Sequence, residues 1–116
     1  MKTLIILNEP AYGDERSYNG LRLGRSLAKS GKTELRLFLM GDAVSVAIRG
    51  QRTPEGYYDL ENMLKALGAA RIDVACCGTC IDARGITEEM LTDAARRSTM
   101  AELTEWTLWA DKVLTF

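Results

Sequence analysis

The chain has 116 residues, 47% of them hydrophobic and 27% charged, which is the size and composition of one globular domain. Fifteen lysine and arginine residues against sixteen aspartate and glutamate residues give a net charge of -1, which argues against binding to nucleic acid or a membrane surface through a basic patch. There is no histidine, so Ser–His and Cys–His nucleophile pairs and histidine metal sites are excluded.

The lack of a long apolar segment limits the class of protein further. The longest stretch without a charged residue, Val74 to Ile81, has eight residues, whereas a membrane-spanning helix needs about 20. The first residues lack the long apolar region and the small-residue cleavage site of a signal peptide. We therefore expect a single cytoplasmic domain over residues 1–116, with no membrane segment.

Short apolar runs predict four β-strands, over residues 3–7, 35–40, 72–76 and 112–116. Helix caps and helical spacing predict helices over residues 14–30 (capped by Asp14 or Ser17), 41–49, 58–67, a short stretch after 87, and 99–110. Because apolar strands alternate with helices, we predict a three-layer α/β sandwich with a mainly parallel sheet. Ligands bind such sheets at the carboxyl ends of the strands, where the loops 8–13 and 77–85 lie.

Four glycines bear on the helices. Gly31 is expected to end the first helix, and Gly68 the helix over residues 58–67. Gly20 and Gly24 fall inside the first helix, where each costs about 1 kcal/mol relative to alanine. We expect a neighbouring backbone to approach the helix closely there.

The last helix bears on assembly. Its apolar residues spread around most of the helix circumference: Met100, Leu103, Trp106, Leu108, Trp109 and Ala110. A helix that is apolar nearly all round is buried on more than one side. We expect a second copy of the chain to cover it, in preference to the chain's own last strand, and so predict a homo-oligomer.

All three cysteines lie in one five-residue segment, as Cys76, Cys77 and Cys80. An odd, clustered set is not the pattern of a disulfide framework. Cys77-Gly78-Thr79-Cys80 is a C-x-x-C motif directly after the third strand. Four interpretations are open: half of a zinc site, a thioredoxin-like dithiol, cysteines that only fill space (which suits Cys76 best), and one nucleophilic thiolate that carries sulfur as a persulfide.

A reactive cysteine needs its thiolate form, and without histidine other groups have to stabilise that charge. Arg84 follows Cys77 by seven residues and is expected to fold back over its sulfur. Gly78 and Gly85 are expected to allow the tight backbone conformations that this requires. Residues 81–85 have the pattern of a loop, whereas a thioredoxin motif opens a long helix, so the dithiol interpretation is less favoured.

Short segments occur in a fixed order along the chain: P-A-Y-G at 10–13, L-R-L at 21–23, L-R-L-F-L-M at 35–40, D-A-V at 42–44, R-G-Q at 49–51, E-G-Y at 55–57, C-G-T-C-I-D-A-R-G at 77–85, W-T-L at 106–108 and A-D-K-V-L-T-F at 110–116. Together they span the whole chain. In this order they resemble the DsrE/DsrF/TusD sulfur-relay superfamily, and most closely its small YchN-like members.

The resemblance implies a flavodoxin-like α/β sandwich that assembles into trimers or hexamers. It implies that Cys77, at a fixed distance before the Arg-Gly pair, carries sulfur as a persulfide. It also implies a site walled by residues of two loops: Pro10, Ala11, Tyr12, Gly13, Gly78, Thr79 and Gly85. Cys80 has no counterpart in the best-established relay subunits, although YchN-like members share it, so a resolving role for this thiol is left open.

We therefore expect a sulfur carrier, without cofactor or metal, that accepts sulfane sulfur at Cys77 from a donor protein and passes it to an acceptor protein. A dithiol redox protein that uses Cys77 and Cys80 is one alternative. A non-catalytic oligomeric binding module is another, with Arg49, Arg52 and Arg84 as contacts to an anion or small ligand. For Arg49 and Arg52, solvated surface charge is the simpler interpretation. No G-x-G-x-x-G or phosphate-binding loop favours a nucleotide or flavin.

Overall fold

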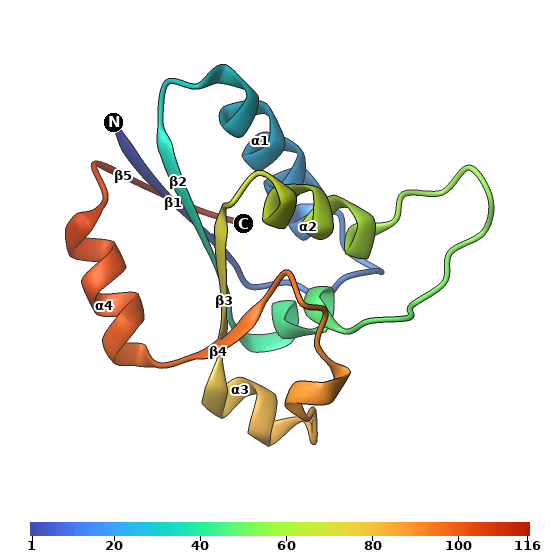
Figure 1. Ribbon diagram of the computed structural model, residues 1–116. Helices are drawn as coiled ribbons and strands as arrows, with labels where there is room; N and C mark the ends of the chain where they lie inside the picture. The colour runs from blue at the N-terminus through green and yellow to red at the C-terminus, as the bar shows by residue number, and fades with distance from the viewer.

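A five-stranded β-sheet forms the centre of the protein in the computed structural model, which describes residues 1–116 (Figure 1). The strands are β1 (Lys2–Leu7), β2 (Glu34–Leu39), β3 (Asp73–Cys77), β4 (Arg96–Ser98) and β5 (Lys112–Thr115). They stand in the order β4-β3-β2-β1-β5, and every neighbouring pair is parallel. The predicted parallel α/β sheet is therefore confirmed.

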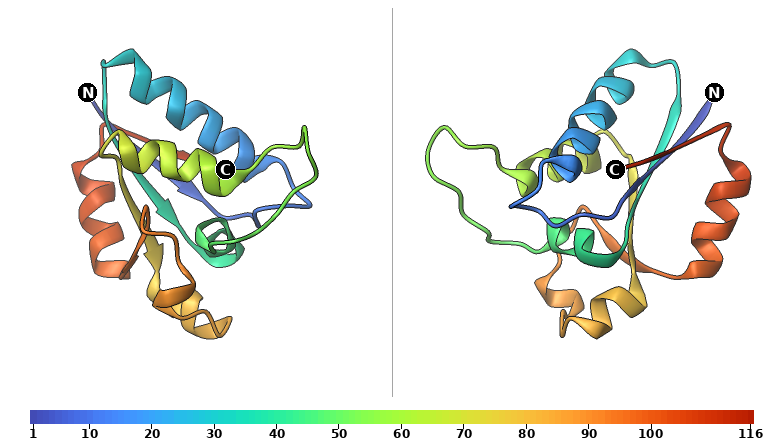
Figure 2. Two further views of the ribbon diagram at one scale, coloured as in Figure 1. Left: turned by 45° about the vertical axis from the view of Figure 1, so that its right-hand side comes forward. Right: turned by 180° about the vertical axis from the view of Figure 1, so that it is seen from behind.

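Helices cover both faces of the sheet, with α1 and α2 on one side and α4 on the other (Figure 2). The helices are α1 (Arg16–Ser30), α2 (Leu60–Ala69), α3 (Gly78–Ala83) and α4 (Met100–Trp109), with two 3₁₀ helices, η1 (Gly41–Ala47) and η2 (Glu88–Met90). This arrangement is the three-layer sandwich that the alternating pattern predicts. None of the helices has the length and apolar character needed to span a bilayer.

The alternation of side chains along the strands divides the interior into two cores. Ile5 and Leu7 of β1 belong to a cluster of 20 buried residues on the face that α1 and α2 cover. Leu4 belongs to a cluster of six buried residues beneath α4. The neighbouring cysteines of β3 are divided in the same way, because Cys76 lies in the larger cluster and Cys77 in the smaller one.

Helix α1 ends where predicted but begins differently. Gly31 closes it in the left-handed conformation, with φ of 64°. Arg16 is its first residue, and Glu15 precedes it without a capping hydrogen bond from its side chain. Asp14 instead accepts a hydrogen bond from the N–H of Arg16 at 2.7 Å, and Ser17 donates to a loop carbonyl at 2.6 Å. Neither expected residue is the N-cap, since both side chains hold the preceding loop.

Helix α2 continues past the glycine that was expected to end it. It begins after Asp59, whose side chain caps it, and extends to Ala69. A Cβ on Gly68 would lie 3.0 Å from the Cβ of Ala94, so this glycine gives space to the segment before β4. The helix ends after the glycine because Arg71 has a positive φ of 62°.

Strand β4 is not predicted from the sequence, because its three residues contain no apolar run. It is an edge strand that pairs only with β3, with Cys77 opposite Ser98. A two-bond ion pair of Arg96 with Asp73 of β3, with both bonds at 3.0 Å, fastens it further. Edge strands are commonly short and charged, which hides them from apolar pattern analysis.

One side of α4 packs on the sheet, and the other is exposed. Leu103 and Trp106 are buried, whereas Leu108 is 83% exposed and Met100 is 59% exposed. The chain's own last strand leaves these two side chains uncovered. The homo-oligomer stays a prediction, and Leu108 and Met100 are residues that it would cover.

Gly20 and Gly24 of α1 give a matched pair of substitutions. A Cβ on Gly20 would collide with the side chain of Leu7 and lie 3.2 Å from the Phe116 ring, so side chains, and not a backbone, approach this glycine. A Cβ on Gly24 would meet its nearest neighbours at 3.7 to 3.8 Å. Either alanine gains about 1 kcal/mol of helix propensity, but only Gly20→Ala overpacks the core, which costs about 1–3 kcal/mol. Urea unfolding should show Gly20→Ala to be the less stable variant; equal stabilities would contradict this packing.

Candidate functional site

The C-x-x-C motif is positioned by the junction between β3 and α3. Cys77 is the last residue of β3 and the N-cap of α3. Its Sγ accepts a hydrogen bond from the backbone N–H of Cys80 at 3.4 Å. In this N-cap geometry the third helical residue turns back toward the cap, which brings the two sulfur atoms to 2.6 Å. Both cysteines are free thiols.

Residues 81–85 complete and close a helix where the sequence predicts a loop. The N–H of Gly85 bonds to the carbonyl of Asp82 at 3.2 Å, and the following N–H bonds to the carbonyl of Ile81 at 3.1 Å. These two bonds form a Schellman motif, which requires the positive φ of 65° at Gly85. The helix was missed because six residues are too few to show helical periodicity. The fixed spacing from Cys77 to Gly85 is therefore the length of a capped short helix.

The thiols of Cys77 and Cys80 differ in acidity because the Cys77 sulfur accepts hydrogen bonds, whereas the Cys80 thiol donates one to it. Burial raises the pKa of Cys77, but hydrogen bonds from the Cys80 thiol, the Thr79 hydroxyl at 3.3 Å and the backbone N–H groups outweigh burial, so this pKa lies below its ordinary value. Burial and the bond donated to Cys77 raise the pKa of Cys80, against the opposing effect of the Gly41 N–H at 3.2 Å. Cys77 therefore ionises before Cys80.

Cys77 lies just beneath the surface. The residue is 6% exposed, and it is part of the small cluster beneath α4. The next residues along the chain form the adjacent surface, because Thr79 is exposed and Cys80 is half-buried. The sulfur is thus shielded by its own turn and lies next to solvent-exposed groups.

Cys76 has different surroundings although it is the next residue. It is completely buried in the larger cluster, and burial is the main cause that raises the pKa of its thiol to about 12. A thiol with this pKa stays protonated at neutral pH and reacts slowly. The space-filling interpretation thus fits Cys76, and the motif proper consists of Cys77 and Cys80.

Arg84 does not supply the charge that was expected over the Cys77 sulfur. Its guanidinium binds Asp42 of η1 through two hydrogen bonds, at 2.7 and 3.1 Å, and donates to the carbonyl of Cys80 at 3.1 Å. The positive charge lowers the pKa of Cys80, although burial and other contacts dominate there. Arg84 therefore fastens α3 to η1 on the Cys80 side of the motif.

The arginine whose charge is weakly coupled to Cys77 is Arg97 of β4, which sequence analysis missed, although hydrogen bonds from Cys80 and Thr79 are what lower the pKa of that thiol. Arg97 is held by two hydrogen bonds of 2.8 Å to Asp82, which raise its pKa, and the charge of Cys77 raises it further. A Cβ on Gly78 would lie 3.0 Å from this guanidinium and 2.8 Å from the carbonyl oxygen of Ser98. Glycine is needed at position 78 because a side chain would not fit between α3 and β4. The tight backbone conformation expected there is absent, since Gly78 has no positive φ. No sequence signal pointed to Arg97, because β4 itself was not recognised.

The loop over residues 10–13 was expected to wall the cysteine site. Its hydrogen bonds and ring stacking are instead with η1, α2 and the segment before α2. Ala11 is buried, and its N–H donates to Ser45 of η1 at 3.0 Å. The Tyr12 hydroxyl accepts a hydrogen bond from the N–H of Leu60 at 3.2 Å, and its ring stacks on Tyr58 with the ring centres 5.8 Å apart.

The half-buried Pro10 and the exposed Gly13 flank these contacts. The loop is joined to the cysteines through η1, whose Gly41 bonds to Cys80; its role as a wall stays a prediction.

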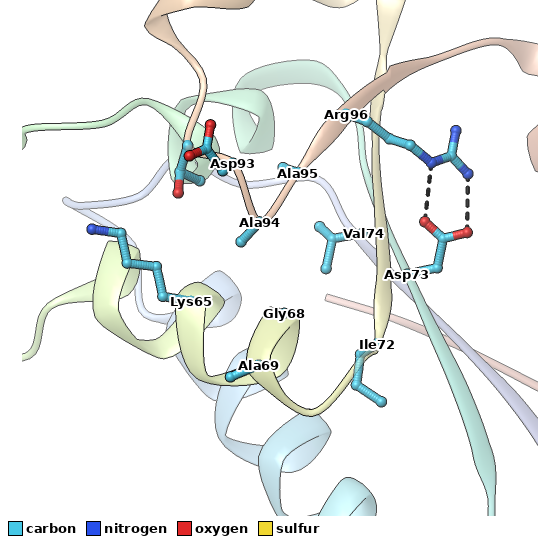
Figure 3. A pocket seen from close by; sticks show the side chains of 11 residues that line it. Lys65, Gly68, Ala69, Ile72, Asp73, Val74, Asp93, Ala94, Ala95 and Arg96 are labelled. Carbon is cyan, nitrogen blue, oxygen red and sulfur yellow. Dashed lines mark hydrogen bonds and ion pairs between the residues drawn. The ribbon is translucent and has the colours of Figure 1, made fainter.

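A hollow of about 540 Å³ lies away from the cysteines, between α2 and the segment that leads into β4 (Figure 3). Lys65 and Asp93 lie at one end of it, and the ion pair of Arg96 with Asp73 lies at the other. None of its lining residues is a cysteine. The C-x-x-C thiols and this hollow are therefore separate features of the molecule.

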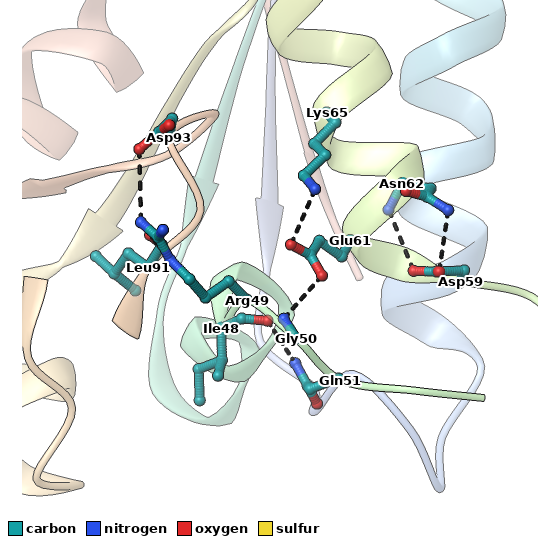
Figure 4. Close-up of polar contacts among 10 residues, drawn as sticks. All are labelled: Ile48, Arg49, Gly50, Gln51, Asp59, Glu61, Asn62, Lys65, Leu91 and Asp93. Carbon is teal, nitrogen blue, oxygen red and sulfur yellow. Dashed lines mark hydrogen bonds and ion pairs between the residues drawn. The ribbon is translucent and has the colours of Figure 1, made fainter. Parts of the chain in front are cut away.

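The arginines of the binding-module alternative do not converge. Arg49 donates to the carbonyl of Leu91 and lies 3.5 Å from Asp93, which ties the segment after η1 to the segment before β4 (Figure 4). Arg84 is bound to Asp42, as described above, and Arg52 is exposed. The chain also has no group of three or more histidine, cysteine, aspartate or glutamate side chains arranged to hold a metal ion.

A family model described as the DsrE/DsrF-like family matches residues 1–116. Protein YchN of Escherichia coli (strain K12) is 46% identical over 116 residues, which cover 99% of this chain and 98% of YchN. The uncharacterized protein MJ0989 of Methanocaldococcus jannaschii is 36% identical over 118 residues, which cover 100% of both chains. The resemblance inferred from the motifs is thus confirmed over the whole length.

Solved structures agree with the sequence relatives. The crystal structure of YchN from E. coli matches with a TM-score of 0.94 at 45% identity, over 100% of this chain and 99% of that one. A protein of unknown function, MTH1491 from Methanobacterium thermoautotrophicum, matches with a TM-score of 0.80 at 13% identity, over 99% and 98% of the two chains. The second similarity shows that the fold is shared.

The acidity of Cys77 is open to direct measurement. Alkylation by iodoacetamide follows the thiolate fraction, so the rate at Cys77 should be half-maximal at a pH below about 8.5, the ordinary cysteine value. Cys76 should stay unmodified in the folded protein over the same pH range. Mass spectrometry of the digested protein identifies the modified residue, with Cys77→Ser as the control. A half-maximal pH at or above the ordinary value would contradict the hydrogen-bond assignment.

The two guanidinium groups are expected to act on different thiols. Arg97→Gln removes the charge that interacts with Cys77, so the pH of half-maximal alkylation at Cys77 should rise. Arg84→Gln removes the charge beside Cys80 and should leave the Cys77 profile nearly unchanged. Comparing the two variants in the same alkylation assay tests the assignment. A larger effect of Arg84→Gln on Cys77 would reverse it.

Proposed function

The chain belongs to the DsrE/DsrF-like family, and from the site at the end of β3 we propose that it carries sulfur as a persulfide on Cys77. The observation that supports this is the set of hydrogen bonds at the Cys77 sulfur, which hold its pKa below the ordinary value. A thiolate is the form of cysteine that attacks a sulfur electrophile. The family suggests sulfur relay, and a thiol with a lowered pKa suits that role.

The proposed relay consists of two thiol exchanges at a sulfane sulfur. The Cys77 thiolate attacks the outer sulfur of a donor persulfide, the donor S–S bond breaks, and the donor leaves as a thiolate. An acceptor thiolate then attacks the outer sulfur of the Cys77 persulfide, and Cys77 leaves as a thiolate. Electrons balance in each exchange, so the relay requires no redox cofactor.

Three groups around Cys77 are suited to stabilise negative sulfur in both exchanges. The Thr79 hydroxyl and the Cys80 N–H bond directly to its Sγ. Arg97 adds a positive charge that Asp82 holds in place. Fixed dipoles and charges aimed at a developing anion are a usual means of lowering a reaction barrier.

We propose that the relay takes place in the cytoplasm and on a homo-oligomer, and the free thiols and the exposed face of α4 support this setting. A reducing compartment such as the cytoplasm keeps three free cysteines reduced. Leu108 and Met100 are the apolar groups that trimers or hexamers of the chain would cover. Persulfide-bearing donor proteins and thiol-bearing acceptor proteins are the partners that the chemistry requires.

A dithiol redox function is the second candidate. The sulfur atoms of Cys77 and Cys80 lie 2.6 Å apart, and the motif opens the short helix α3, which continues to Ala83 where a loop was expected. In this alternative the two thiols form a disulfide and no sulfur is carried. The two functions differ in the mass of the protein, since a persulfide adds about 32 Da and a disulfide removes about 2 Da.

The relay is tested by loading the protein with sulfur. Reduced Cys80→Ser, which keeps the proposed carrier, is treated with glutathione persulfide, desalted and examined by intact mass. We expect an increase of about 32 Da. The additional substitution Cys77→Ser should abolish the increase, whereas Cys76→Ala should leave it unchanged because that thiol is buried. An equal adduct without Cys77 would show that the assignment is wrong.

A further inference from the structure

We propose that Cys80 is a resolving thiol, which attacks the Cys77 persulfide and releases its outer sulfur as hydrogen sulfide. This inference rests on the proposed function, because it begins from a persulfide on Cys77. It goes further by giving the sulfur a second fate when no acceptor is bound. The protein would then be a reductase of sulfane sulfur as well as a carrier.

The position of Cys80 is the first argument. Its Sγ lies 2.6 Å from the Cys77 Sγ, so attack on that atom requires no movement of the backbone. The helix geometry sets this distance, because the Cys80 N–H also bonds to the Cys77 sulfur. A thiol at this place encounters any persulfide on Cys77 before a partner protein does.

Contacts from another element hold Cys80 in this position. The N–H of Gly41, at the start of η1, donates to its Sγ at 3.2 Å. Arg84 donates to its carbonyl at 3.1 Å and is itself bound to Asp42 of η1. Since η1 follows β2, the second thiol is fixed by a neighbouring strand end as well as by its own helix. The Gly41 bond holds the Cys80 sulfur itself, whereas Arg84 holds the backbone that carries it.

The chemistry balances without an external oxidant. Cys80 attacks as its thiolate: the thiol loses its proton, the Cys80 sulfur forms a bond to the Cys77 Sγ, and the bond from that atom to the outer sulfur breaks. The outer sulfur gains two electrons and leaves as hydrosulfide, taking the Cys80 proton to become hydrogen sulfide. Two cysteine sulfurs are oxidised to a disulfide in exchange. An external dithiol reductant then returns the pair to two thiols, so each turnover consumes one dithiol.

The test follows sulfide and protein mass in parallel. Reduced wild type and Cys80→Ser are each treated with one equivalent of glutathione persulfide under anaerobic conditions and then desalted. We expect the wild type to release about one equivalent of sulfide and to lose about 2 Da, and Cys80→Ser to keep its added sulfur at least about tenfold longer. The Cys76→Ala variant should behave as the wild type does, and its disulfide can only join Cys77 to Cys80.

The other outcomes separate the two proposals. A wild-type adduct that persists as long as the one on Cys80→Ser overturns the resolving role and leaves the relay intact. Release of sulfide by Cys80→Ser as fast as by the wild type also overturns it, because the release then requires no second thiol. Failure of Cys80→Ser to take up sulfur, in a variant that circular dichroism shows to be folded, overturns the relay itself. Cys80→Ala repeats the test with a side chain that forms no hydrogen bonds.

Discussion

The hydrogen bonds that end at the Cys77 sulfur are the interaction on which the site depends. At this residue the chain leaves β3 and enters α3, and the first turn of a helix has backbone N–H groups without helical partners. The cysteine sulfur accepts one of them and so acts as the cap. One contact therefore ends the strand, begins the helix, places Cys80 beside Cys77 and favours the anionic form of the sulfur.

The short helix that follows is maintained by its surroundings. Six residues are too few for a helix that is stable alone. Ile81 buries its side chain in the larger core, and two ion pairs hold α3 from opposite sides, Arg84 with Asp42 of η1 and Arg97 of β4 with Asp82. The charged residues near the thiols thus serve two purposes, because the same contacts that position the helix also set the electrostatic environment of each sulfur.

The pKa values of the adjacent cysteines Cys76 and Cys77 shift in opposite directions because their side chains point to opposite faces of the sheet. Successive side chains of a β-strand point to opposite faces. Cys76 is turned into the larger core, where burial makes it a very weak acid, whereas Cys77 is turned toward α4 at the end of the sheet. A shift of the strand register by one residue would exchange the two environments, so the register of β3 against β2 determines which thiol is buried in the larger core and which caps α3.

The sequence by itself determined the parallel α/β sheet, the C-x-x-C motif at the end of β3 and the left-handed glycines at Gly31 and Gly85. These features depend on local patterns: apolar runs, spacing within a few residues, and backbone conformations that glycine adopts most readily. The tertiary structure decided that Arg97 interacts with Cys77, that Arg84 binds η1 and that β4 exists at all. The ion pairs that fix these arginines, Arg97 with Asp82 and Arg84 with Asp42, join residues 15 and 42 positions apart, and packing of the whole chain, which no local pattern records, brings them together.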